Sequence, residues 1–413
     1  MTQTNVSITH FYIATFFLLF IFFQPLLESI SPFFRYSDEI LLTLAILIFI
    51  LLTTQSMIMS KTNALVLLWS FYIVSVSVIF GTNKSITDIL LQNIFHLKLL
   101  LFFMFFHATL SYNLTSTILK FLFTLTLIGG ILSFILPGIF SAFLDHNRYS
   151  GSGIWGLSQP IGFQLNPNKL SRNLSLIVVL SPALLNMSKF NYRCLYLSSL
   201  FLIILSGSRS ALAIFALLSV FNLAFNYPKE IRLITKSIIF PLTLLSIVLV
   251  AFTAMRLSNL GGADLTGENA PVFRAILLYD GFTLAIDNFP FGAGLATFGT
   301  PLSLDQVTYD KLLTGQTFFF ERGTVHDINY ASLLGEFGFF GAAFFLFVFH
   351  KVMVSKIYGV DKCTIYKLLL YIILIPFFES TLQSSISSLM IGLVFCLVSK
   401  FVISRSIQRN YPR

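Results

Sequence analysis

The chain has 413 residues, of which 56% are hydrophobic and 10% are charged. These shares lie far from those of globular proteins, so the composition excludes a water-soluble chain of two or three domains. The net charge of +9 does not indicate nucleic-acid binding, because the basic residues are spread over short loops and the C-terminus instead of one patch. We therefore expect a membrane protein.

Apolar runs of about twenty residues recur along the chain, and each can cross a hydrocarbon layer of roughly 30 Å. Stretches 41–52 and 99–106 are apolar on every face, unlike the alternating strands of a membrane barrel. The expected fold class is all-α, with one polytopic transmembrane domain over residues 1–413 and about twelve spans. The expected spans are 11–28, 40–59, 63–81, 90–110, 117–137, 173–188, 193–206, 210–226, 237–255, 330–350, 365–379 and 386–403.

Alternate short loops are dense in lysine and arginine, which predicts the orientation. The apolar segment near residue 11 lacks a basic stretch and a cleavage site, so we interpret it as a retained span. The positive-inside rule then predicts that both termini are cytoplasmic. The basic residues on that side are Lys61; Lys189 and Arg193; Lys229, Arg232 and Lys236; Lys351, Lys356 and Lys362; and Lys400, Arg405, Arg409 and Arg413.

Two segments on the opposite side, 138–172 and 256–329, exceed a simple turn, and loops that long usually carry a function. Neither contains an Asp-x-Asp element, so we expect no metal site, and no cofactor is expected. The cysteines Cys194, Cys363 and Cys396 show no metal-ligand spacing, so neither a disulfide nor a zinc site is expected.

Three residues of the outer side are catalytic candidates: Arg209 at the mouth of span 210–226, Arg274 in the long loop, and His326 where that loop enters the next span. Two guanidinium groups suit a diphosphate, because each offers a planar fork of donors and stays charged. A neighbouring histidine can take or relay a proton near neutral pH. The combination indicates chemistry on a phosphorylated substrate.

Each candidate also has a structural interpretation. Arg209 alone would be a juxtamembrane anchor. Arg274 would pair with Glu268 or Asp280, and His326 would cap a helix. Their placement on one membrane face favours the joint functional interpretation.

The candidates lie in three runs: Gly207-Ser208-Arg209-Ser210-Ala211-Leu212, then Arg274 with Asn288-Phe289-Pro290-Phe291-Gly292-Ala293-Gly294, then His326-Asp327-Ile328-Asn329 with Leu334-Gly335-Glu336-Phe337-Gly338-Phe339-Phe340-Gly341. These runs and their order resemble the O-antigen polymerase and O-antigen ligase superfamily. The sequence departs from the family pattern at Asp327, where asparagine is expected.

The resemblance implies a GT-C-like, multi-pass protein of the bacterial inner membrane. Its implied activity is a metal-independent glycosyl transfer at the periplasmic face, using an undecaprenyl-diphosphate-linked donor and a glycan acceptor in polysaccharide or lipopolysaccharide biosynthesis. Arg209 and Arg274 would stabilise the charge that grows on the departing diphosphate. His326 would either act as the base for the acceptor hydroxyl or hold the diphosphate. A chain-length regulator and membrane lipid are the implied partners, and nucleic acid is not.

An earlier outer run, Gly162-Phe163 before Asn166-Pro167-Asn168, also resembles the family. The substrate-binding residues that we derive from the resemblance are Asn166, Asn168, Asn329, Glu336 and Glu379. Structural hydrogen bonding is the alternative role for the glutamates, Glu268 included. In the fourth span, His96 and Lys98 are either functional, because ionisable groups are costly there, or interfacial.

Other functions remain open. A ligase would pass the finished polymer to lipid A-core with overlapping motifs. A flippase or transporter also has about twelve spans, but should place ionisable or helix-breaking residues at the midplane, often in two similar halves. A structural membrane subunit is the remaining class. The placement of the candidates at one face favours the polymerase or ligase over the transporter.

Overall fold

The computed structural model describes residues 8–31, 34, 61–80, 84–143, 158–226, 270–300, 302–303, 306–316, 329–375 and 384–410. All regular elements among these residues are helices, and no β-strand occurs among them. The expected all-α class is confirmed for this part of the chain.

Within the described residues, five helices are long and apolar enough to cross a membrane. This finding supports a membrane-embedded helical protein, although the described residues do not establish about twelve spans. The predicted spans 40–59 and 237–255 lie outside the described residues. The five helices are α3 (Lys61–Phe80), α4 (Ile86–Thr109), α5 (Tyr112–Ile135), α14 (Asn329–Phe349, continued to Ile357) and α17 (Ser385–Asn410).

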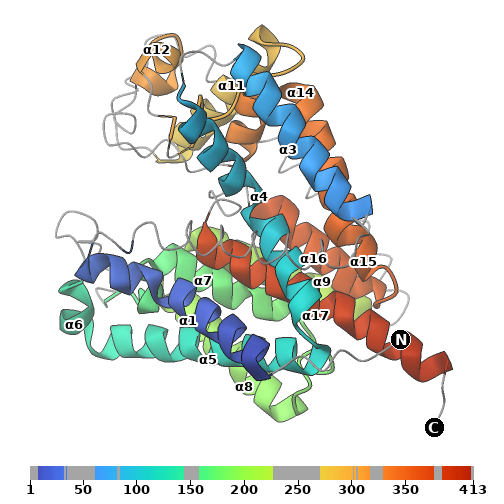
Figure 1. Cartoon of the computed structure of the whole chain (residues 1–413). Helices are drawn as coiled ribbons and strands as arrows, with labels where there is room; N and C mark the ends of the chain where they lie inside the picture. The colour runs from blue at the N-terminus through green and yellow to red at the C-terminus, as the bar shows by residue number, and fades with distance from the viewer. Residues whose placement is uncertain are drawn as a thin grey trace.

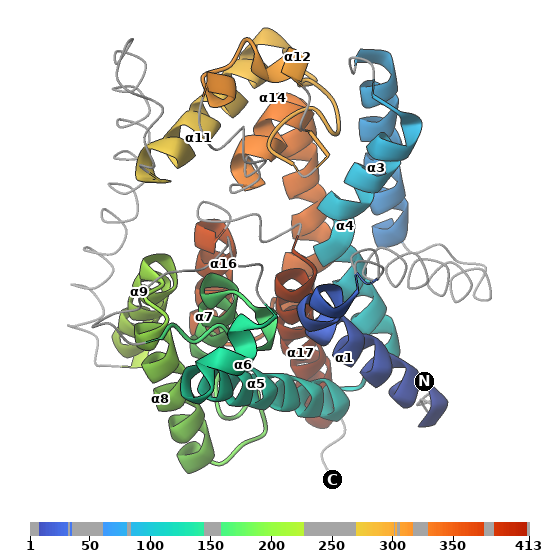
Figure 2. The same cartoon turned by 90° about the vertical axis from the view of Figure 1, so that its left-hand side faces the viewer.

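The remaining helices are not among these five candidate spans, although several coincide with predicted spans. They are α1 (Ile8–Ile30), α6 (Pro137–Ser141), α7 (Pro167–Ser175), α8 (Lys189–Leu205), α9 (Arg209–Asn226), α11 (Ala270–Asp287), α12 (Gln306–Tyr309) and α16 (Lys362–Leu374). Figures 1 and 2 show two groups of helices: α3, α11, α12 and α14 form one, and α1, α5, α7, α8, α9 and α17 form the other. Helix α4 runs from the first group into the second.

Helix α17 is the core of the second group, since residues 386–399 are all buried. Helix α4 lies along it in the same direction, because Phe103 stacks edge-on against Phe395 and His107 lies 3.1 Å from the Ser399 hydroxyl. Helix α5 follows a short turn and lies along α17 in the opposite direction, with Thr115 3.8 Å from the Cys396 sulfur.

The prediction of a helical span over 173–188 is wrong. Helix α7 ends at Ser175, a 3-10 turn covers Leu176–Val178, and 179–188 is irregular. Irregular backbone inside an apolar bundle must have its polar groups satisfied by other protein groups. Side chains of α5, α8 and α16 supply these donors: Tyr192 to the carbonyls of Ile177 and Leu180, Lys367 to Val178, Tyr112 to Ala183 and Leu184, and Ser116 to Leu185.

The expected outer segment 256–329 contains a regular helix, α11. Its buried residues include Ala275, Ile276 and Leu277, and they face the first part of α14, where Gly281 lies against Ala331. Apolar residues at helical spacing explain why this part of the segment is ordered as a helix.

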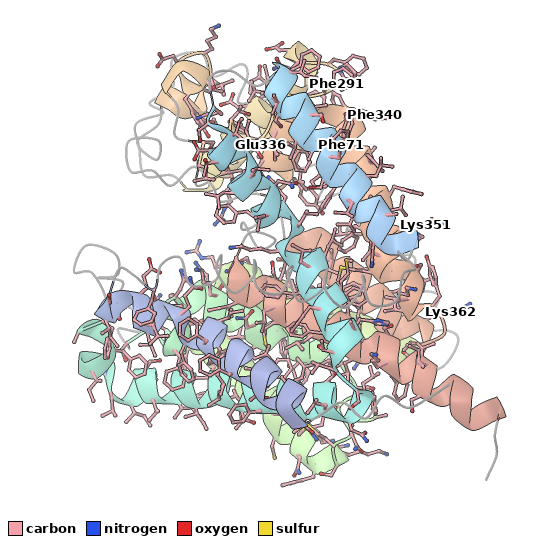
Figure 3. The ribbon with its side chains drawn as sticks, in the orientation of Figure 1. Phe71, Phe291, Glu336, Phe340, Lys351 and Lys362 are labelled. Atoms are coloured by element: carbon pink, nitrogen blue, oxygen red, sulfur yellow. The ribbon has the colours of Figure 1, made fainter. Side chains whose placement is uncertain are left out.

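Helix α3 runs antiparallel to the later part of α14. Its Trp69 contacts Phe345, while its Phe80 stacks on Phe291, which precedes α14 in the chain. The start of α3 and the end of α14 therefore lie at the same end of the bundle, and both carry the basic loops. Figure 3 shows Lys351 well away from Phe291. Which side of the membrane this end faces stays a prediction.

Candidate functional site

Helix α14 is broken at Gly338, whose backbone has φ 63° and ψ −172°. The break leaves helix-end carbonyl and N–H groups without intrahelical partners. The motif Pro290–Gly294 supplies them: Ala293 N–H donates to the Gly335 carbonyl (2.8 Å), and Gly294 N–H to the Glu336 carbonyl (3.0 Å). On the other side of the break, Phe340 N–H donates to the Pro290 carbonyl (3.3 Å). Two of the motifs found in the sequence thus form one structural unit.

This union requires two of the glycines. A Cβ atom on Gly292 would overlap the backbone of Gly338, and a Cβ atom on Gly338 would overlap the backbone of Gly292. Both residues have positive φ, which favours glycine. The glycine spacing is therefore explained by a backbone-to-backbone contact.

Glu336 lies two residues before the break, and its carboxylate is completely buried. Its Oε2 lies 2.8 Å from His96 Nε2 on α4. Its Oε1 accepts from Thr297 N–H (3.1 Å) and from the Thr300 hydroxyl (3.3 Å). Gln92, one turn before His96, lies 3.0 Å from the same ring nitrogen. The group joins α4, α14 and the segment 288–300 through one side chain.

A second carboxylate anchors the other side of this unit. Asp280 on α11 accepts hydrogen bonds from the Thr314 N–H (2.6 Å) and hydroxyl (2.5 Å). Burial raises the pKa of Asp280, and the two bonds from Thr314 oppose that shift. Tyr309 accepts from Gly299 N–H at 2.8 Å. We call α11, the segment 288–300 and α14 the α11–α14 region.

The earlier motif and the serine-arginine turn form a second pair. Asn166 caps α7 by accepting from Asn168 N–H and Lys169 N–H. One turn into α7, the Ser171 hydroxyl donates to the Ser206 hydroxyl (2.5 Å), which also accepts from Ser208 N–H (3.3 Å). Helix α7, which begins in the Asn166–Asn168 run, therefore lies against the turn that starts α9. We call residues 167–226, together with the side chains of α16 that contact them, the α7–α9 region.

The sequence interpretation missed two cations in this region. Arg172 on α7 is 1% exposed, and its Nε donates to the Asn168 carbonyl (3.1 Å). Its own carbonyl accepts from the Tyr371 hydroxyl (3.0 Å). Lys367 on α16 is 2% exposed and donates to the Val178 carbonyl (2.9 Å) and to Asn222 (3.2 Å). The available signal was their position, since Arg172 directly precedes the expected span 173–188 and Lys367 lies within the expected span 365–379.

The predicted site residues fall into the two regions. Arg209 is the first residue of α9 and is exposed; Arg274 lies on α11 and is half-buried. Asn329 is the buried first residue of α14, and its carbonyl accepts from Ser332. His326 and Glu379, as well as Glu268, lie outside the described residues.

Comparison with known proteins identifies no relative: no family model, no curated protein and no solved structure matches the chain. Among the described residues, no group of three or more His, Cys, Asp and Glu side chains is arranged to hold a metal ion.

Proposed function

We propose that the chain is a polymerase that joins undecaprenyl-diphosphate-linked repeat units at the periplasmic face of the bacterial inner membrane. In this proposal the protein has about twelve spans and a GT-C-like architecture. The observation that carries the proposal is that runs far apart in the sequence meet: 290–294 fills the helix break at 335–340, and helix α7, which begins in the run 166–168, bonds through Ser171 to Ser206 at the turn before α9. Sequence motifs that are far apart in the chain but contact one another in the fold are typical of a functional site.

The proposed reaction is a substitution at the anomeric carbon. A hydroxyl oxygen of the acceptor glycan forms a bond to that carbon, and the bond from the carbon to the diphosphate oxygen breaks. The electron pair leaves with the lipid diphosphate, and the acceptor proton passes to a base. Arg209 and Arg274 would bind the diphosphate, whose charge grows as the bond breaks. His326 would take the proton or hold the diphosphate.

Alanine substitution of each of Arg209, Arg274 and His326 tests this assignment. Loss of one fixed donor to the growing charge costs on the order of 3 kcal/mol in the barrier, or about a hundredfold in rate. We expect long-chain polysaccharide to disappear on a gel while the protein remains in the membrane. Arg193→Ala, on exposed α8 surface, is the matched control and should keep full chain length. Full-length polymer in all three site variants would refute the assignment.

Deletion of the gene distinguishes a polymerase from a ligase. Lipopolysaccharide core that carries a single repeat unit indicates a polymerase. Bare core with accumulating lipid-linked polymer indicates a ligase instead. The resemblance covers both activities, so this gel decides between them.

A repeat-unit flippase or transporter is the second candidate function, and one observation favours it. The buried pair of His96 and Glu336 lies in two candidate spans, beside a helix break at Gly338. Buried ionisable groups and broken helices are features of transporter sites. Loss of a transporter would strand single repeat units on the inner leaflet, where an impermeant glycan-modifying reagent added outside cannot reach them.

A further inference from the structure

We propose that Glu336, held by His96, is a positioning residue for the transfer reaction. In this role its hydrogen bonds hold the segment 288–300 in the break of α14. They thereby fix the position of α11, the helix that carries Arg274. The inference rests on the proposed function, because it assigns a task within that reaction. It assigns Glu336 no contact with the substrate.

Protein groups occupy both carboxylate oxygens of Glu336. Its two oxygens receive Thr297 N–H, the Thr300 hydroxyl and the His96 ring, and its side chain is 0% exposed. A substrate group would have to displace one of these donors to reach it. The carboxylate is therefore occupied by the protein itself, which differs from the predicted role in substrate binding.

Glu336 and His96 are both buried, which is unfavourable for ionisable side chains unless they are paired. An ionisable side chain in a membrane bundle is costly unless it is paired and hydrogen-bonded. The partner on α4 lies 240 residues away in the sequence, and Phe337 packs edge-on against its ring at 4.6 Å. Both residues lie in apolar helices, where an apolar pair would fill the same space. The polar pair of His96 and Glu336 can form in only one alignment of α4, α14 and the segment 288–300, so it fixes how these elements pack.

Helix α11, which carries Arg274, packs against α14. Gly281 of α11 lies against Ala331 of α14, so close that a Cβ atom on it would reach the Ala331 carbonyl oxygen at 2.5 Å. Arg274 lies about two turns earlier on the same helix. His326 lies three residues before Asn329, the first residue of α14. Helix α11, which carries Arg274, is thus attached to the unit that Glu336 fastens.

A crosslink reports this position without any activity measurement. The rings of Phe80 on α3 and Phe291 in the segment are stacked at 5.4 Å. Cysteines at these two positions, in a full-length protein whose three native cysteines are replaced by serine, should be joined by a short bifunctional thiol reagent. We expect high yield with Glu336 intact and with Glu336→Gln, whose amide oxygen still accepts from Thr297 and Thr300. Glu336→Ala and His96→Ala should lower the yield.

Polymer synthesis in membranes is measured on the same variants without the added cysteines. A hydrogen bond to a charged group corresponds to about a 10-fold to 100-fold effect, and we expect a loss of that size for Glu336→Ala and His96→Ala. Glu336→Gln should restore most of the rate, because positioning needs acceptors and not a charge. The matched control, His107→Ala on the same helix, also removes one hydrogen bond and should leave rate and crosslink unchanged. Where the alanine variants do not accumulate, Thr300→Val replaces them and should give a partial loss of both.

Two outcomes would overturn the inference. One is an inactive Glu336→Gln variant with an intact crosslink, which would mean that the side chain acts through its proton, as in a transporter. The other is an unchanged crosslink in Glu336→Ala. Failure of the proposed function gives a different result: Arg209→Ala, Arg274→Ala and His326→Ala would then all still make full-length polymer. The crosslink yields would still decide whether Glu336 positions the segment.

Discussion

The α11–α14 and α7–α9 regions both interrupt a helix within the bundle, but they satisfy the exposed backbone groups differently. At the α14 break the partners are backbone groups of another segment, and two glycines allow the close approach. After α7 the partners are long side chains that reach in from neighbouring helices. A backbone partner tolerates no added volume, whereas a side-chain partner is lost by removing one polar group. Substitutions that add volume should therefore destabilise the α11–α14 region most, and substitutions that remove a polar group should destabilise the α7–α9 region.

Added volume at the α14 break should have the largest effect. Gly338→Ala places a methyl group against the backbone of Gly292, at a φ and ψ that only glycine adopts readily. We expect a loss of about 3 to 5 kcal/mol in the free energy of unfolding, from backbone strain and overpacking together. Thermal denaturation in detergent measures it.

Gly138→Ala is the matched control for that substitution. Gly138 lies in α6, and a Cβ atom there would meet no atom within 4 Å. Its unfolding temperature should stay within the error of the unchanged protein. Equal behaviour of the two alanine variants would show that the contact between the 290–294 motif and α14 is not tight.

Removal of one hydroxyl should destabilise the α7–α9 region by less. Tyr192→Phe leaves the Leu180 carbonyl without its side-chain donor in a buried, irregular stretch, while the Ile177 carbonyl keeps the Leu180 N–H. An orphaned buried acceptor costs about 1 to 3 kcal/mol. Thermal denaturation again measures the loss, and Tyr72→Phe on α3, which removes a hydroxyl that has no hydrogen-bond partner, should show none. A loss for Tyr72→Phe equal to that for Tyr192→Phe would refute the role of the hydroxyl.

The smallest effect concerns the pH dependence of the α11 anchor. Burial raises the folded-state pKa of Asp280 above its ordinary value, so the folded protein favours the protonated carboxyl. The stabilisation is then complete below the ordinary carboxyl pKa and is lost as the pH rises through the raised one. Asp280→Asn keeps an acceptor for Thr314 and should remove this part of the pH dependence. Unfolding temperatures of both proteins over that acidic range test it; parallel curves would contradict the assignment.

The sequence predicted most of the helices and missed the interruptions. Hydropathy located α3, α4, α5, α14 and α17, because twenty apolar residues in a row are a local property. The prediction over 173–188 was wrong because the residues there are apolar enough for a helix. The backbone can be irregular only because Tyr192, Lys367 and Tyr112 donate hydrogen bonds to its carbonyls. The break at Gly338 was equally hidden within an apolar run.

The candidate site was predicted in part. The resemblance identified the runs 162–168, 207–212, 288–294 and 334–341 as related. The structure joins 290–294 to 335–340 and places Ser171 of α7 against Ser206. Which pairs form was not visible in the sequence, and neither was the buried Arg172. The assignment of the catalytic role to Arg209, Arg274 and His326 stays a prediction.

Composition, apolar run length and loop charge by themselves determined that this is a helical membrane protein, because each depends only on residues that are neighbours in the chain. The tertiary structure alone decided where helices break and which polar groups meet. The bond between His96 and Glu336 exists because α4 and α14 pack together, and no local pattern specifies a partner 240 residues away.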